Sequence, residues 1–452
     1  MFTRLRSWFT AHESNLILGL LAVAVALRAL LILDSPTPFG YVWDFYHDGV
    51  RILADEGRLP VAEDCWQCYH PPVFYLLGWP LFALGRALAG GDALALRLTA
   101  ALSIPASAAV VYYGYRLLRL FGCRGASLVA GLALLFATPL LFISSYGAEA
   151  DIVMSAFMSA FIFYFTRYAA SPSVATTSEV AVIGALAGLA MATKYSGLLA
   201  LVTAGLVFGG QLLLGPSRPR ALRHGLIVLV VCLTVGGWKY RDNVHRYGTP
   251  LFANGSAADG LTVGEREPGG RYEFTTLRLG EVGALFGFSA PRGELTTFPV
   301  YQSVPTTLHA LVWSDMSVFS NRSRHGAPDD PYPHKNIPVS LIMAVMVLGF
   351  VPEALAVLGM VVTIRRRVFA PLLVFVLLSL VAYLWWVIPQ ETWALKPKYV
   401  LFILPPLVVY AAVGLAWLVR RMPVAAVVAA AAMAGLVGLC NIYLYAFANG
   451  RL

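Results

Sequence analysis

Charged residues are scarce in this chain. Only 13% of its 452 residues are Asp, Glu, Lys or Arg, whereas 58% are hydrophobic, and the mean hydropathy is +0.71. This composition excludes a soluble globular domain, which usually carries about twice that share of charge. Apolar runs of about 20 residues, the length that crosses about 30 Å of hydrocarbon as a helix, recur through the chain. We therefore predict an all-α polytopic membrane protein, and composition alone fits a transporter, a channel or an enzyme.

Basic residues are also few, and they form no long run. The 33 Lys and Arg outnumber the 24 Asp and Glu, which gives a net charge of +9, but they stand in short clusters between apolar runs. Such clusters are typical of the cytoplasmic loops of membrane proteins, so they indicate topology and do not favour a nucleic-acid partner. The first apolar run contains Arg28 and lacks a small-residue cleavage site, so we expect a retained span.

Cysteine is rare, with five residues in the chain. Cys123, Cys232 and Cys440 lie in or beside apolar runs and are expected to act as small apolar residues. Cys65 and Cys68 form a C-x-x-C in a polar segment. A zinc site would need more ligands than this pair supplies. A local disulfide would form if the segment faces an oxidising compartment, and the sequence leaves that question open.

Eleven apolar runs are predicted to span the membrane. A further run at 72–90 is nearly as long, but the distribution of arginine argues against another crossing. If residues 72–90 lie along the outer interface as an amphipathic element, every short arginine cluster falls on the cytoplasmic side. If residues 72–90 cross the membrane, every arginine cluster that follows them in the chain falls on the outer side instead. The predicted spans are 15–34, 95–117, 126–146, 150–168, 178–193, 196–214, 224–240, 338–363, 369–388, 399–419 and 423–446.

This topology leaves two large outer loops. The first, 34–92, contains the C-x-x-C and the interfacial element, and the second, 241–337, is too long to be a plain connector. We expect residues 1–240 to form a transmembrane module that includes the first loop. Residues 241–337 would fold over the outer face, and residues 338–452 would supply the C-terminal transmembrane helices.

Chemically useful side chains collect at the outer ends of the predicted spans. The segments W-D-F-Y-H-D-G at 43–49 and Y-H-P-P at 69–72 place two carboxylates and two histidines beside the membrane, where such groups are costly. Three of the five lysines also fall at outer span ends. Cations with carboxylates close by suit an anionic headgroup and proton transfer. The candidate residues are Asp44, Tyr46, His47, Asp48, Tyr69, His70, Glu149, Asp151, Lys194, Arg241, Lys396, Lys398 and Tyr399.

Each candidate also has a purely structural interpretation. Asp44 or Asp48 could cap a helix that begins near Gly49. Tyr69 and His70 could be interfacial amphiphiles, and Glu149 and Asp151 could simply face a helix dipole. The lysines could snorkel or lie on the surface. The functional interpretation depends on the convergence of these residues in one place.

The order of the motifs resembles the GT-C superfamily of membrane glycosyltransferases. After the first-loop Asp come Y-H-P-P-V-F-Y at 69–75, E-A-D at 149–151, A-T-K-Y-S-G at 192–197, W-K-Y-R-D-N at 238–243 and K-P-K-Y at 396–399. The resemblance covers most of the chain and is nearest to the branch of the protein O-mannosyltransferases and the lipid A aminoarabinose transferase. It implies a GT-C-type bundle of about 11 transmembrane helices with two large outer loops.

The resemblance also implies roles for the candidate residues. Asp44, with Asp48 as the second choice, would be the catalytic base. The donor would be a polyprenyl-phosphate sugar, because cations beside the leaving phosphate would offset its developing charge. We expect His70, Lys194, Arg241, Lys396 and Lys398 to bind the donor phosphate. We expect Tyr46, His47, Tyr69, Glu149, Asp151 and Tyr399 to bind substrate.

These expectations describe a glycosyltransferase at the periplasmic face of a bacterial inner membrane. It would move the sugar to an acceptor hydroxyl by one inverting displacement, and the acceptor could be a glycan, a lipid or a protein. No cofactor is required by this chemistry. A divalent cation is the open alternative, since Asp44, Asp48, Glu149 and Asp151 could supply oxygen ligands.

Two other classes of function fit part of the pattern. A transporter or flippase of a lipid-linked or anionic substrate would also place charges at span ends, but it would depend on charged residues at mid-span, which are scarce here. An assembly subunit could keep the same fold without activity. Asp44→Asn separates the enzyme from both, because it would abolish turnover and leave lipid binding intact.

Overall fold

The computed structural model describes most of the transmembrane part of the chain. The described residues are 15–30 except 16 and 24, 46–252 except 145, 146, 148 and 216, then 273–278, 303–314, 338–387 and 397–449. Within these ranges the chain is helical, with one isolated bridge between Glu273 and Ser303 and no strand. The prediction of an all-α membrane protein is therefore confirmed.

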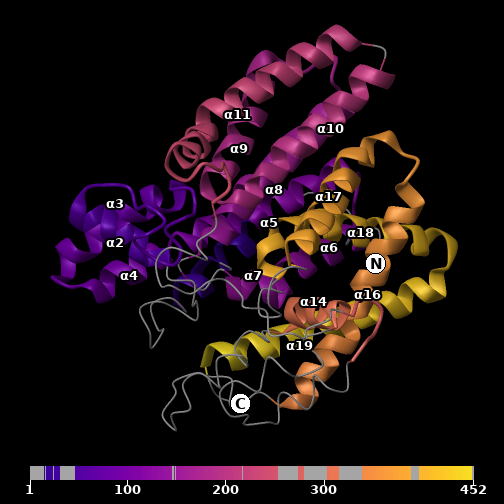
Figure 1. Ribbon diagram of the computed structural model, residues 1–452. Helices are drawn as coiled ribbons and strands as arrows, with labels where there is room; N and C mark the ends of the chain where they lie inside the picture. Colours follow the sequence, from indigo (N-terminus) through magenta and orange to yellow (C-terminus); the bar gives the residue numbers. More distant parts are fainter. Residues whose placement is uncertain are drawn as a thin grey trace.

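The helices follow one another, with short connections from α3 to α11 (Figure 1). In chain order they are α2 (Tyr46–Glu56), α3 (Val73–Ala89), α4 (Asp92–Ala100), α5 (Ser103–Leu120), α6 (Ala126–Ala137), α7 (Pro139–Ser144), α8 (Ala150–Ala170), α9 (Thr177–Thr193), η1 (Tyr195–Gly197), α10 (Leu198–Leu214), α11 (Arg218–Tyr247), α14 (Val304–Trp313), α16 (Val339–Thr363), η4 (Arg367–Phe369), α17 (Ala370–Val387), η6 (Pro397–Ile403), α18 (Leu404–Arg421) and α19 (Pro423–Asn449).

Eight helical segments in the described part of the chain are long and apolar enough to cross a membrane. Each coincides with a predicted span, and shorter apolar helices occupy the other three predicted spans, so the count of eleven is not confirmed. The eight segments are Asp92–Leu120, Ala150–Ala170, Tyr195–Leu214, Arg218–Tyr247, Ser340–Thr363, Arg367–Trp386, Lys398–Arg421 and Pro423–Tyr445. The three shorter helices are Ile17–Leu30, Ala126–Ala137 and Thr177–Thr193.

The predicted span at 126–146 is divided by a proline. Thr138 has an extended backbone (ψ 115°) and ends α6, and Pro139 begins α7. Proline lacks a backbone N–H and disfavours the helical conformation of the residue before it, so the two helices cannot be continuous. The short helix α7 then leads the chain to the start of α8.

Two helices form the centre of the bundle. The spans Ala150–Ala170 and Lys398–Arg421, which contain α8 and α18, are each 72% buried, whereas Pro423–Tyr445 is 22% buried and faces outward. In Figure 1, α8 and α18 lie among α5, α6 and α17. Side chains at the first turns of α8 and α18 are therefore surrounded by other helices rather than by lipid.

Close packing of α9 on α11 fixes the end of α9. A Cβ atom at Gly188 would lie 2.8 Å from the carbonyl oxygen of Cys232, a contact that only glycine avoids. Small residues let membrane helices approach in this way without a large apolar core between them. The contact holds the C-terminal end of α9, where Lys194 follows, against the last turns of α11.

Helices α2, α3 and α4 form a separate layer at one side of the bundle (Figure 1). Asp92 at the start of α4 joins it to α3 through Arg86 (2.7 Å) and to α2 through Arg51 (3.0 Å), and Arg86 also pairs with Asp55. The opposite side of α3 exposes an apolar row. An exposed apolar row beside charged residues suits the interfacial position predicted for residues 72–90. The row comprises Leu76, Leu77, Trp79, Leu84 and Leu88.

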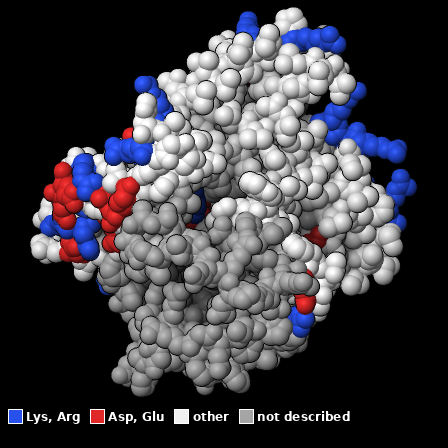
Figure 2. All heavy atoms as spheres, in the orientation of Figure 1, with Lys and Arg blue, Asp and Glu red and all other residues white. Residues whose placement is uncertain are grey.

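Charged side chains divide between two regions of the surface (Figure 2). Acidic and basic groups mix over the layer of α2 to α4, whereas Lys and Arg alone gather along the upper and right edges of the view. Four of the arginines in the described chain stand at helix ends remote from the first loop, namely Arg119, Arg218, Arg367 and Arg420. This separation matches the positive-inside pattern predicted from the sequence.

Candidate functional site

The ends of four elements bring the predicted site residues together. Helix α9 ends at Thr193, Lys194 is extended, and the turn η1 leads into α10. Glu149 precedes α8 and Asp151 lies in its first turn. Lys398 and Tyr399 lie in η6, directly before α18, and Tyr46 begins α2. Residues separated by as many as 350 positions therefore share one end of the bundle.

A buried ion pair lies at the centre of this site. Lys194 Nζ lies 2.7 Å and 2.8 Å from the two carboxylate oxygens of Asp151, and it also donates to the Tyr46 hydroxyl at 3.0 Å. Asp151 is fully buried and Lys194 is 7% exposed. A buried charge is tolerated when it is paired and hydrogen-bonded, and here the lysine has three hydrogen bonds. The contact therefore fixes the positions of both side chains.

A second pair lies beside the first. Lys398 Nζ lies 2.7 Å from Glu149 Oε1, and Glu149 is buried. Both lysines lie close to the ring of Tyr399, with Lys194 Nζ 4.5 Å and Lys398 Nζ 5.8 Å from its centre. Both carboxylates also lie at the positive end of the α8 dipole, which agrees with the structural interpretation of these residues, and their binding of substrate stays a prediction.

The first loop adds an aromatic stack to the cluster. His70 stacks on Tyr46 with ring centres 5.5 Å apart, and Tyr69 packs on the other side of His70 at 4.0 Å. His70 is 5% exposed. His70 therefore lies against the ring of Tyr46, whose hydroxyl accepts from Lys194, and its predicted binding of the donor phosphate stays a prediction.

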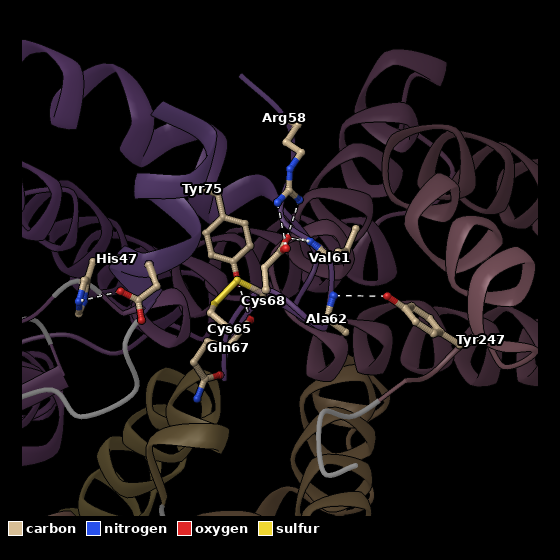
Figure 3. The surroundings of a disulfide bond; sticks show 11 residues. His47, Arg58, Val61, Ala62, Cys65, Gln67, Cys68, Tyr75 and Tyr247 are labelled. Carbon is tan, nitrogen blue, oxygen red and sulfur yellow. Dashed lines mark hydrogen bonds and ion pairs between the residues drawn. A yellow bond between two sulfur atoms is a disulfide. The ribbon is translucent and has the colours of Figure 1, made fainter. Parts of the chain in front are cut away.

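A disulfide between Cys65 and Cys68 supports this part of the loop (Figure 3). The turn is closed by the Cys68 amide donating to the Cys65 carbonyl at 3.1 Å, and Tyr75 of α3 donates its hydroxyl to the carbonyl of Gln67. Gln67 also accepts from the His70 amide at 3.1 Å. The alternative that the sequence left open is settled in favour of a disulfide, which lies two residues before His70.

His47 and Asp48 form a pair in the first turn of α2 (Figure 3). His47 Nε2 lies 3.3 Å from Asp48 Oδ1. Burial lowers the pKa of His47, although Asp48 partly opposes this shift and Arg51 adds to it. The imidazole is therefore neutral at neutral pH, and Asp48 keeps a half-buried carboxylate at the helix start.

Several contacting residues were missed from the sequence. Tyr195 donates its hydroxyl to the Tyr69 carbonyl at 2.9 Å and accepts from Asn243 Nδ2 at 2.7 Å. Asn243 is buried in α11 and also donates to the Pro250 carbonyl at 3.0 Å. Tyr195 lies in the A-T-K-Y-S-G motif and Asn243 in the W-K-Y-R-D-N motif. Membership of these motifs is the one sequence feature that indicates a role for them. Their contacts depend on the packing of α9 against α11, which no local pattern reveals.

Of the remaining predicted site residues, two are not described by the structure and one lies outside this cluster. Asp44 and Lys396 lie outside the described residues. Arg241 is exposed on α11, and within the described ranges no hydrogen bond or ion pair joins it to Lys194 or Lys398. The assignments of Asp44 as base and of Lys396 and Arg241 to the donor phosphate stay predictions.

A metal site is not formed by the part of the chain that the structure describes. No group of three or more His, Cys, Asp or Glu side chains that could hold an ion occurs among those residues. Glu149 and Asp151 each contact a lysine instead. Their use as metal ligands would require those lysines to move, and the divalent cation stays a prediction.

Comparison with known proteins agrees with the geometry. Residues 69–238 match the family model of dolichyl-phosphate-mannose-protein mannosyltransferase. No match was found among curated protein sequences.

Solved structures with a similar fold include an archaeal oligosaccharyltransferase. AglB from Archaeoglobus fulgidus, in complex with an inhibitory peptide and a dolichol-phosphate, has a TM-score of 0.54 at 16% identity, covering 97% of this chain and 56% of AglB. The same enzyme in complex with Zn and sulfate has a TM-score of 0.53 at 14% identity, over 94% of this chain and 52% of that one. The chain thus spans about half the length of AglB.

A weaker likeness is to ArnT from Cupriavidus metallidurans in the apo state. Its TM-score is 0.40 at 16% identity, covering 89% of this chain and 77% of ArnT.

The family match and the AglB fold together confirm the resemblance to the GT-C superfamily of membrane glycosyltransferases. The protein is accordingly a multi-pass membrane protein with a GT-C fold.

Proposed function

We propose that this protein transfers a sugar from a polyprenyl-phosphate donor to an acceptor hydroxyl at the outer face of a bacterial inner membrane. The observation that supports this most is the pair of lysines, buried Lys194 and partly buried Lys398, that both lie close to the Tyr399 ring at one end of the bundle. Asp151 positions Lys194 and Glu149 positions Lys398. His70 stacks on Tyr46, whose hydroxyl accepts from Lys194. Preorganised cations of this kind stabilise charge that develops in a transition state.

The fixed Nζ atoms of Lys194 and Lys398 favour an anionic ligand. Each lysine is matched by one carboxylate, so the two pairs together are neutral while the Nζ atoms stay fixed. A phosphate would share the lysine protons that now bind Asp151 and Glu149, and His70 could add a further hydrogen bond. Because the carboxylates already offset the lysine charges, a phosphate would gain from the oriented Nζ–H donors, which bind an anionic oxygen more strongly than a neutral one.

The reaction needs one bond to form and one to break. The acceptor oxygen attacks the anomeric carbon, and the bond from that carbon to the phosphate oxygen breaks with inversion. The acceptor's proton passes to a first-loop carboxylate, Asp44 or Asp48, and polyprenyl phosphate leaves with the electron pair. The phosphate is a good leaving group, so cations beside it replace a strong general acid.

Similar proteins support the donor class. The family matched by residues 69–238 is described by its dolichyl-phosphate-mannose donor, and AglB was solved with a dolichol-phosphate. Both descriptions name a dolichol-linked phosphate. A lipid of this kind could enter the candidate site from the membrane, because the site lies at one end of the helix bundle. The active site would then face the periplasm, since the arginine-rich helix ends lie on the opposite side.

The test is transfer of radiolabelled sugar from a panel of polyprenyl-phosphate donors by the purified full chain, with membrane extract as acceptor. Wild type should transfer label from at least one donor. Asp44→Asn and Lys194→Met should each lower transfer at least a hundredfold while still folding. Lys239→Met is the matched control, because Lys239 is an equally buried lysine of α11 outside the site, and it should keep most of the activity.

Failure of the proposal would be equally clear. If a second enzyme shows that the acceptor extract is competent but wild type transfers no label from any donor, the chain is not a transferase of this class. Binding of donor lipid without transfer would then favour a transporter or flippase.

A further inference from the structure

One acidic residue stands in the middle of an otherwise uncharged span. Glu353 is the only charged residue between Ser340 and Thr363, and it follows Pro352 inside α16. It lies about 21 Å along the helix from Val339, at 1.5 Å per residue. Placing an ionisable side chain at such a position costs free energy, so we expect Glu353 to have a function.

Glu353 is bound by a helix from the predicted second outer loop. Its Oε1 atom lies 2.8 Å from His309 Nδ1 and accepts from Trp313 Nε1 at 2.8 Å. His309 Nε2 lies 2.8 Å from the Met346 carbonyl of α16. His309 and Trp313 are both in α14 and both buried, so the two helices are joined by a three-residue polar contact.

The geometry fixes the protons of this contact. A carbonyl only accepts, so His309 Nε2 must carry a proton and donate it to Met346. A second proton must then lie between Nδ1 and Glu353, either as imidazolium with carboxylate or as imidazole with carboxylic acid. In both forms the pair is neutral overall, which lowers the cost of keeping it within a span.

Shape complementarity accompanies the hydrogen bonds. The His309 ring stacks on Phe350 with centres 3.9 Å apart and planes inclined by 9°. A Cβ atom at Gly349 would lie 2.5 Å from Trp313 Cδ1, so the indole rests directly on the α16 backbone. Any movement of α14 away from α16 would separate the partly exposed Glu353 from its partners and leave the buried His309 without its hydrogen bonds, which costs free energy.

Helix α14 also contacts the candidate site. It packs against α7, which leads to Glu149, and against η6, which contains Lys398 and Tyr399. We propose that His309, Trp313 and Glu353 form a latch that docks α14 of the second outer loop onto the bundle and so positions η6. These are positioning residues, and only their effect on turnover rests on the proposed function.

Hydrogen exchange of the full chain in detergent tests the docking without any substrate. Glu353→Ala should speed amide exchange about tenfold in residues 304–313 and 397–403, and leave residues 150–170 unchanged. Glu353→Gln should exchange faster than wild type but more slowly than Glu353→Ala, because its side-chain oxygen still accepts from Trp313, whereas His309 Nδ1 faces that same oxygen and not the amide nitrogen. Gly349→Ala should reproduce Glu353→Ala, since it displaces Trp313 without removing a polar group.

The control is Val357→Ala, a lipid-facing change on the same helix that should alter nothing. The latch is wrong if Glu353→Ala exchanges as slowly as wild type, or if exchange rises throughout the bundle. It is also wrong if Glu353→Gln matches Glu353→Ala, since negative charge and not hydrogen bonding would then be the requirement.

Sugar transfer supplies a second readout. If α14 acts through η6, Glu353→Ala should lower transfer in wild type but cause no further loss in Lys398→Met. Additive losses would mean that the latch does not act through Lys398. If wild type transfers no sugar, the proposed function fails, while the exchange result still decides whether α14 is latched.

Discussion

Lys194 Nζ lies within 2.8 Å of both carboxylate oxygens of Asp151, although the two residues come from the ends of different helices. The pair is buried and is completed by the Tyr46 hydroxyl. Such a pair could serve only to join α8 to α9, or it could hold a lysine ready for an anionic ligand. Exchanging the two charges separates these roles.

The first prediction concerns this exchange. In the double variant Asp151→Lys with Lys194→Asp, the ion pair can re-form, so a purely structural role predicts recovery of both stability and transfer. Because we assign Lys194 a role in binding phosphate, we expect the melting temperature to recover relative to Lys194→Asp alone while transfer stays at least a hundredfold low. Melting and label transfer on the same preparations check both parts, and recovered transfer would refute the assignment.

The Tyr46 hydroxyl can be removed without disturbing its ring. Tyr46→Phe keeps the stack on His70 but removes the acceptor for Lys194, which costs about 1 kcal/mol or more for a buried charged donor. We expect kcat/KM for the donor to fall about tenfold, with the acceptor KM unchanged. An effect on the acceptor KM alone would contradict the position of Tyr46 on the donor side.

The stability of the first loop should depend on pH through His47. Burial lowers the pKa of His47 in the folded protein below its usual value of 6.5, so the unfolded chain takes up the proton first as the pH falls. The folded state therefore loses stability below about pH 6.5, at no more than about 1.4 kcal/mol per pH unit. We expect His47→Gln to reduce the fall in melting temperature between pH 7 and pH 5, and an unchanged fall would count against this account.

The disulfide should matter for His70 as well as for stability. Replacing both Cys65 and Cys68 by serine frees a loop with a sequence separation of 3, which costs about 2 kcal/mol in the chain-entropy model. Since His70 follows two residues later, we expect weaker donor binding along with the lower melting temperature. Cys232→Ser, at a buried free cysteine, is the control for loss of a thiol, and donor binding should be normal in it.

Much of the architecture could be predicted from hydropathy and arginine distribution. Long apolar runs have few alternatives in a membrane, and the clustering of arginine at one set of helix ends fixed the side on which Lys194 and Lys398 would lie. The division of the run at 126–146 by Pro139 could also have been anticipated, because proline cannot continue a helix from an extended Thr138.

The contacts within the site could not be predicted in the same way. Nothing local indicates that Asp151 pairs with Lys194 while Glu149 pairs with Lys398, since these contacts depend on how the ends of α8, α9 and η6 meet. The same holds for His309 and Glu353, which were not recognised at all because α14 is short and lies in a polar loop. The order of the spans predicted that Lys194 and Lys398 lie at the same end of the bundle, and the packing of the helices determines which carboxylate each one contacts.

The most direct measurement is the structure of this protein with a polyprenyl phosphate bound. The account predicts that phosphate oxygens lie within about 3 Å of Lys194 Nζ or Lys398 Nζ, with the polyprenyl chain leaving toward the lipid. A phosphate bound elsewhere, with both lysines still paired only to Asp151 and Glu149, would contradict it.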